Sequence, residues 1–190
     1  MAAIVAASPR PAVAGDICVL LALSRPLSGR GAAFIDRLHA DLGGERVEPL
    51  HVTVDRVATS DPATLVRAVR ESVARLRPAP VRADRLYFLP SQSRGPEIVK
   101  LEVGPDAVLD RDVDEVLAAL RRCGLPSLYP EHRVKPTITT LQRVTRRESV
   151  EPDVSGLPIE LFVADRVIVS RITGPARYDI VDSASIPASG

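Results

Sequence analysis

Apolar positions in the first half of the chain alternate between the spacing of strands and the spacing of helices. Residues 16–23 form a nearly continuous apolar run, which predicts a buried central strand. A second apolar run, residues 50–57, predicts another strand. Two segments carry apolar residues three and four positions apart, the spacing of an amphipathic helix. The first has Phe34, Ile35, Leu38 and Leu42 before Gly43, and the second begins at Asp61-Pro62 and has Leu65, Val69, Val73 and Leu76.

The second half of the chain continues in the same manner. Residues 82–89 and 97–103 have the composition of two strands joined by a polar loop. The clearest helical pattern follows, with Leu109, Val113, Val116, Leu117 and Leu120 on one face and Gly124 as the stop. An extended segment is predicted over 134–144, and two late strands are predicted near 159–172 and 178–181.

This order of elements predicts an α+β fold. Amphipathic helices bury one face, and here they are expected to pack on an antiparallel or mixed sheet. The two halves repeat a similar order, so we expect two similar lobes with a central cleft, each lobe a small sheet backed by helices. Residues 16–182 are expected to form one bilobal domain, preceded by a flexible leader over 1–15 and followed by a loose tail over 183–190.

Composition narrows the classes of partner. The chain of 190 residues is 45% hydrophobic and 26% charged, which is the balance of a globular domain. A formal net charge of +1 supplies no general field for duplex DNA or an anionic membrane, and 3% aromatic residues leave little to stack on bases. No apolar run reaches the length of a membrane span. We therefore expect a cytoplasmic protein that is a monomer. Any anion that it binds is expected to be held by a local cluster of residues.

The cysteines and acidic residues suggest no metal centre. Cys18 and Cys123 have neither metal-ligand nor disulfide spacing, and both are expected to be buried in apolar surroundings. The acidic residues at the start of the third helix are expected to be helix-terminal charges. The sequence also has no glycine-rich phosphate loop and no Gly-x-Ser-x-Gly motif. We expect no metal and no cofactor.

Two strand segments share a pattern that suggests chemistry. Each has a proline shortly before an extended stretch that contains X-apolar-Thr, and an Arg-Val pair follows. Since alternate residues of a strand share a face, His51 and Thr53 point to one side while Val52 and Val54 point to the core. In the second segment, Thr137 and Thr139 share a face and Ile138 lies opposite.

On these residues the chain resembles the two-histidine (2H) phosphoesterase superfamily, which includes RNA 2′,3′-cyclic phosphodiesterases and the bacterial 2′-5′ RNA ligase group. The mark of that superfamily is a pair of His-x-Thr/Ser-x motifs that face each other across a cleft. The resemblance extends over roughly residues 16–181. His51-Val52-Thr53-Val54 matches the first motif, whereas Pro136-Thr137-Ile138-Thr139 has threonine where the second motif has histidine.

The resemblance implies roles for these residues. One histidine of the pair takes a proton from the attacking group, the other protonates the leaving oxygen, and the nearby hydroxyls bind the phosphate. His51 is then the catalytic residue, and Thr53, Thr137 and Thr139 are substrate-binding residues. Threonine does not titrate near neutral pH as histidine does, and a positioned acid or base contributes roughly 10²- to 10⁴-fold in rate. The degenerate second motif therefore predicts reduced or altered activity.

Three further residues are candidates for binding the anion. His132 lies five positions before Thr137, and a loop there would have to fold back to reach the cleft. Lys135 and Arg143 flank the second motif and are cations, although arginine does not act as a general acid. The alternative for each is an ordinary surface residue. His39, in the first predicted helix, is expected to be structural.

Three functions stay open on the sequence. The first is a hydrolase of cyclic or linear phosphodiesters of nucleotides or RNA ends, with His51 as acid or base. The second is a cleft reused for a small metabolite that is not a phosphate. The third is a ligand-binding protein without catalysis, which the threonine at position 137 suggests.

Overall fold

A computed structural model describes residues 12–59, 61–89, 97–129, 136–146, 148–174 and 176–188. The helices in this part of the chain are α1 (Gly29–Leu42), α2 (Pro62–Val73) and α3 (Ala107–Arg122). The strands are β1 (Ile17–Ala22), β2 (Glu45–Arg46), β3 (His51–Val57), β4 (Ala79–Leu89), β5 (Ile98–Val103), β6 (Thr137–Gln142), β7 (Ile159–Ala164), β8 (Arg166–Gly174) and β9 (Arg177–Ser185).

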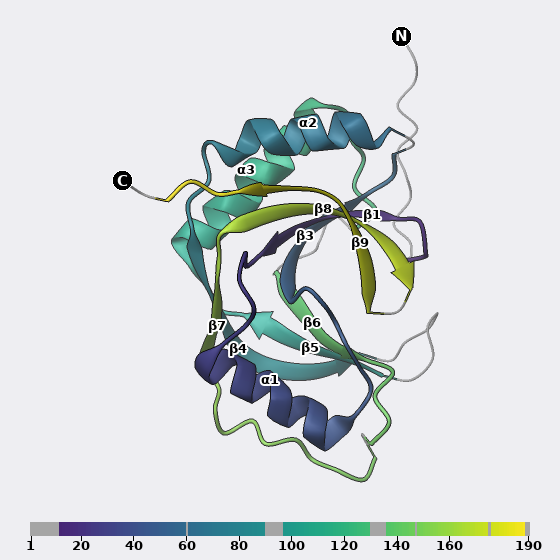
Figure 1. Ribbon diagram of the computed structural model, residues 1–190, viewed down its shortest axis with the longest axis vertical. Coiled ribbons are helices and arrows are strands. Elements are labelled where there is room, and N and C mark those ends of the chain that lie inside the picture. The colour runs from purple at the N-terminus through teal and green to yellow at the C-terminus, as the bar shows by residue number, and fades with distance from the viewer. Residues whose placement is uncertain are drawn as a thin grey trace.

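The strands form one curled sheet in the order β7-β4-β5-β6-β3-β1-β8-β9, and β2 adds to β6. Figure 1 shows this order from one side of the molecule. Every pairing between these strands is antiparallel. The predicted α+β class is confirmed. The separate small sheet expected for each half is replaced by one continuous sheet, because β3 and β6 meet in the middle and join the two four-stranded halves.

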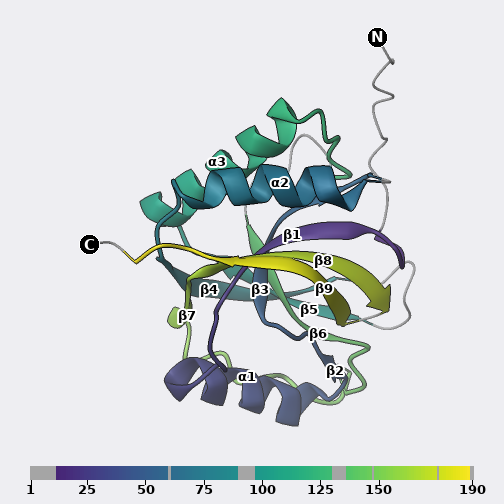
Figure 2. The same cartoon turned by 45° about the horizontal axis from the view of Figure 1, so that its top comes forward.

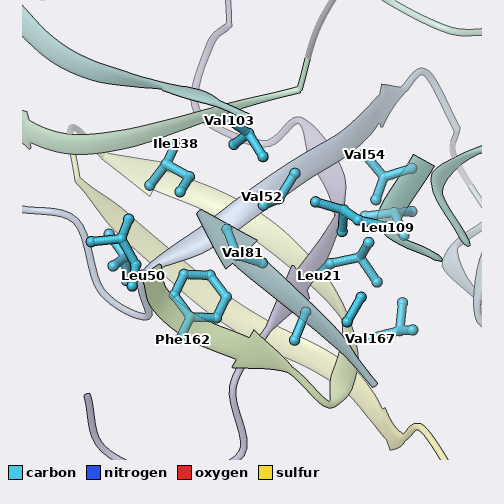
Figure 3. Packing of buried hydrophobic residues seen from close by; sticks show 14 of the residues in the cluster. Leu21, Leu50, Val52, Val54, Val81, Val103, Leu109, Ile138, Phe162 and Val167 are labelled. Atoms are coloured by element: carbon cyan, nitrogen blue, oxygen red, sulfur yellow. The ribbon is translucent and has the colours of Figure 1, made fainter. Parts of the chain in front are cut away.

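The three helices all pack on the same face of the curled sheet. Their buried residues belong to one large core with alternate residues of the strands, among them Val52 of β3 and Ile138 of β6. Because the sheet is curled, helices that pack on this one face lie on two sides of the molecule. Figure 2 shows α2 and α3 together on one side and α1 on the other, with the strands between them. In Figure 3, Val52 and Ile138 lie near each other among the aliphatic side chains of this core. The predicted inward direction of Val52 and Val54 is confirmed.

Local signals fix the starts of α2 and α3. The Asp61 carboxylate accepts a hydrogen bond from the backbone N–H of Ala63 at 3.0 Å, and Pro62 is the first helical residue. Asp106 caps α3 in the same way, accepting from Val108 and Leu109. Both helices therefore begin where backbone N–H groups would otherwise lack a partner.

Three expectations at the level of elements need correction. The strand predicted near 159–172 is two strands, because the chain leaves β7 at one edge of the sheet and re-enters the other half as β8 after Asp165. The tail expected over 183–190 is partly ordered, since β9 continues to Ser185 and Ile186 is buried. Cys18 is buried as expected, but Cys123 follows the end of α3 and is exposed.

The two remaining expectations concern the N-terminal leader and membrane-spanning segments. Residues 1–11 of the leader predicted over 1–15 lie outside the described residues; within the rest, the Gly15 N–H donates to the Ile172 carbonyl at 2.7 Å. No helix in the described part of the chain is long and apolar enough to cross a membrane.

Candidate functional site

The two threonine-containing motifs lie side by side at the centre of the sheet. Val52 of β3 pairs with Ile138 of β6. Continuing this antiparallel register by one residue places His51 opposite Thr139 and Thr53 opposite Thr137. Directly opposed residues of an antiparallel pair have Cβ atoms about 5 Å apart and share a face. The structure therefore brings together His51, Thr53, Thr137 and Thr139 on the face away from the helices.

A line of side chains crosses this helix-free face through His51. Thr139 pairs with Lys100 of β5, and Lys100 pairs with Tyr87 of β4. On the other side, His51 pairs with Ala22 of β1, and Ala22 pairs with Arg166 of β8. We call this set the His51 row: Tyr87, Lys100, Thr139, His51, Ala22 and Arg166. It brings two cations to the same line as the imidazole.

The face has a polar half and an apolar half. On the β1 and β8 side, a small second core of Cys18, Leu20, Ala22, Ile168 and Ile172 contains no helix residue. On the β5 and β6 side, Lys100, Glu102 and the threonines are half-buried. An anion bound where the two halves meet would contact the threonine hydroxyls and Lys100 on one side. On the other side it would contact the apolar side chains of the second core.

His51 is held in one tautomer. Its Nδ1 lies 2.6 Å from the Pro49 carbonyl oxygen. A carbonyl can only accept, so Nδ1 carries the proton and Nε2 presents a lone pair. The ring is fully buried, with an exposed fraction of 0%, and packs edge-on against Tyr178 with the ring centroids 4.9 Å apart.

The Nε2 atom of His51 has no hydrogen-bond partner within the described part of the chain. A buried acceptor left unpaired costs about 1–3 kcal/mol, and such an atom in a folded protein calls for an explanation such as a catalytic or ligand-binding role.

The surroundings of His51 keep it neutral. Burial lowers the pKa of the imidazole to about 4, the hydrogen bond to Pro49 opposes this, and the nearby positive charge of Lys100 lowers the pKa further. A neutral ring at physiological pH suits a proton acceptor, and it cannot serve as a proton donor there.

This burial has a measurable consequence for stability. The unfolded chain binds a proton on His51 below pH 6.5, whereas the folded chain does so only near pH 4. Between these values the unfolded state gains protons relative to the folded state, so stability falls as pH falls. We expect His51 to contribute a loss of about 3 kcal/mol across this window. Urea unfolding of the wild type and His51→Gln at several pH values measures it, and parallel curves for the two proteins would contradict a buried neutral ring.

The other predicted site residues lie elsewhere or outside the described part. Arg143 follows the end of β6, is exposed and pairs with Glu45 at 3.0 Å. It is four residues beyond Thr139, roughly 13 Å along an extended chain. The structure therefore does not place it in the His51 row. His132 and Lys135 lie outside the described residues. His39 lies within 3.2 Å of the Gly44 carbonyl oxygen, through its Nε2.

Sequence reasoning misses Lys100 and Tyr178. Lys100 lies in a predicted strand where Ile98, Lys100 and Glu102 alternate with Val99, Leu101 and Val103, so its exposure to the helix-free face follows from period two. Its place beside Thr139 depends on which strands pair, and that order cannot be read from the pattern. Tyr178 reaches His51 from β9, more than 120 positions away along the chain.

In the described part of the chain, no group of three or more His, Cys, Asp or Glu side chains is placed to hold a metal ion. The groups that the His51 row itself offers to a ligand are the imidazole, the hydroxyls and the cations.

Comparison with solved structures finds the same fold in LigT, in a phosphoesterase and in the MHV ns2 PDE domain. LigT of E. coli, complexed with 3′-AMP, matches with a TM-score of 0.60 and 16% identity over 92% of this chain and 99% of LigT. TT0787 of Thermus thermophilus matches with a TM-score of 0.59 and 17% identity over 92% and 100% of the two chains. The MHV ns2 PDE domain matches with a TM-score of 0.51 and 12% identity over 88% and 99%.

Neither a protein-family model nor a curated protein matches the sequence. The resemblance to the 2H superfamily that the motifs carry is confirmed at the level of the fold, over most of the chain.

Proposed function

We propose that this chain is a divergent phosphoesterase that hydrolyses cyclic or linear phosphodiesters of nucleotides or RNA ends, with His51 as its single general base. The observation that carries the proposal is the His51 imidazole, whose tautomer is set by Pro49 and whose Nε2 is an unpaired acceptor across from Thr139.

In this proposal, His51 accepts the proton of the attacking water and solvent protonates the leaving oxygen. Nε2 of His51 takes the proton of the attacking water as the new phosphorus–oxygen bond forms. The bond between phosphorus and the leaving ribose oxygen breaks, and that oxygen takes a proton from solvent because Thr137 does not titrate near neutral pH. The proton on His51 then returns to solvent. A base with a pKa near 4 is weak, so both features predict slow turnover.

Binding of the phosphate is assigned to the neighbours of His51. The hydroxyls of Thr53 and Thr139 can donate to phosphate oxygens, and Lys100 supplies positive charge from the next strand. Proteins of the same fold support a nucleotide ligand: LigT has been crystallised with 3′-AMP, with ATP, with NADP+ and with phosphate.

Binding without turnover is the second candidate function. The complete burial of His51 and the threonine at 137 favour it, because a substrate oxygen reaches Nε2 only if the covering side chains yield. Both functions use the same phosphate contacts and differ in whether product forms.

The proposal is tested with a 2′,3′-cyclic nucleotide as substrate. We expect slow release of the nucleotide monophosphate above a buffer blank. Thr139→Val should raise KM roughly ten-fold, since a hydrogen bond to a charged group contributes about 1.5–3 kcal/mol. Thr173→Val, in an exposed position of β8, is the matched control and should leave KM unchanged. Binding of the nucleotide with no product would favour the second function, and no binding at all would reject both.

A further inference from the structure

A pocket of about 400 Å³ opens where β3 and β6 separate. The two strands pair only at Val52 and Ile138 within the described part of the chain. Farther along β3, its edge is taken by the segment after α3, where the Leu128 N–H donates to the Arg56 carbonyl at 2.7 Å and Val57 pairs with Ser127. The space left between β3, the end of β5 and α3 is the pocket. Its volume falls within the range of small-molecule sites.

The walls of this pocket combine apolar surface with two carboxylates. Val54, Val103, Val113 and Leu117 give it aliphatic sides. Asp110 and Asp114 stand on α3, one turn apart and on the same side of the helix, and both are exposed. Among the described residues, neither carboxylate is held in an ion pair. These groups can therefore accept hydrogen bonds from a ligand.

Thr53 connects the pocket to the His51 row. It lines the pocket, and it lies two residues from His51 on the same face of β3. Two residues of a strand span roughly 7 Å. That is about the separation between the phosphate and the base of one nucleotide, so a phosphate beside His51 and Thr139 would bring its base to the gap between β3 and β6, where Thr53 borders the pocket.

We propose that this pocket is a nucleobase subsite that selects guanine, an inference that rests on the proposed nucleotide phosphoesterase function. The aliphatic walls suit the faces of a planar ring. Guanine presents two adjacent donors, N1–H and the N2 amino group, and one carboxylate can accept from both. Adenine, cytosine and uracil each place an acceptor beside their donor on the corresponding edge, and that acceptor is repelled by a carboxylate.

The experiment measures the affinity of the whole chain for 3′-GMP, 3′-AMP, guanosine and inorganic phosphate by calorimetry. We expect 3′-GMP to bind on the order of ten-fold more tightly than 3′-AMP, the size of one well-formed bidentate contact to a base. The double variant Asp110→Asn/Asp114→Asn should bind the two nucleotides within about two-fold of each other and keep its affinity for phosphate. Asp179→Asn, which removes an exposed carboxylate from β9, is the control and should retain the preference.

Val113→Phe provides a second variant, because the larger ring fills the pocket from its half-buried position on α3. It should lose guanosine binding and keep phosphate binding, with circular dichroism confirming that it is folded. Equal affinities for 3′-GMP and 3′-AMP, or a preference that survives the double variant, would overturn the guanine subsite while the phosphate function stands. Failure of phosphate and both nucleotides to bind would instead reject the proposed function itself.

Discussion

Replacing His51 with alanine is expected to reduce turnover of a 2′,3′-cyclic nucleotide by about 10²- to 10⁴-fold, which brings it to the buffer blank. No other residue with a side chain that accepts a proton at neutral pH stands beside Thr139 on β3 and β6 in the described part of the chain. Substrate binding should change less than the rate, because the hydroxyls and Lys100 still hold the phosphate.

The measurement is single-turnover cleavage at pH 7, followed by chromatography of the products. His39→Ala is the matched control, since it removes the histidine of α1, which interacts with Gly44 and lies away from the His51 row. Thermal unfolding checks that the His51→Ala protein is folded, because the substitution leaves a cavity beside Tyr178. A folded His51→Ala protein that cleaves as fast as the wild type would contradict the assignment of His51 as the base.

Replacing Thr137 with histidine is expected to raise the rate of cleavage by about 10²- to 10⁴-fold, the contribution of the missing acid. Thr137 and His51 are diagonal neighbours across the β3–β6 pairing, at a separation of roughly 7–8 Å and somewhat less between their Cβ atoms. Two imidazoles at that spacing can flank one phosphate. Glu102 stands opposite Thr137 on β5, and its negative charge favours the protonated form of the new ring.

The pH dependence separates this mechanism from a general effect on binding. An acid at position 137 makes the rate fall as pH rises through its pKa, whereas the wild type should show no such decline at neutral pH. Thr137→Asn is the control, because it supplies a polar side chain that does not titrate. A rate for Thr137→His no higher than that for Thr137→Asn would contradict the roles assigned to the two motif positions, base at 51 and acid at 137.

The sequence predicts the parts of this fold that local signals specify. The Asp61-Pro62 start of α2 and the apolar stripe of α3 depend on neighbouring residues only, and both are confirmed. The break between β7 and β8 escapes sequence reasoning because both strands are apolar and only Asp165 lies between them. Its side chain accepts hydrogen bonds from Ser24, a contact that the linear pattern cannot reveal.

The candidate site likewise has features that follow from the local sequence and features that depend on distant residues. The strand period of two correctly places His51 and Thr53 on one face of β3, and Thr137 and Thr139 on one face of β6. That the two stretches are neighbours follows from the resemblance of the motifs. The complete burial of His51 does not follow from the sequence, since it depends on side chains from distant elements, among them Tyr178.

The order of strands has a consequence for how the chain is made. β1 pairs with β8, so Ile17 meets Arg171 across more than 150 positions of sequence. During synthesis from the N-terminus, one edge of β1 therefore stays without its partner until β8 has emerged. Such distant pairing slows folding, and an uncovered edge invites pairing with other chains. Nascent or C-terminally truncated forms that lack β8 are expected to aggregate, whereas β5 and β6 have both of their neighbours once β6 has been made.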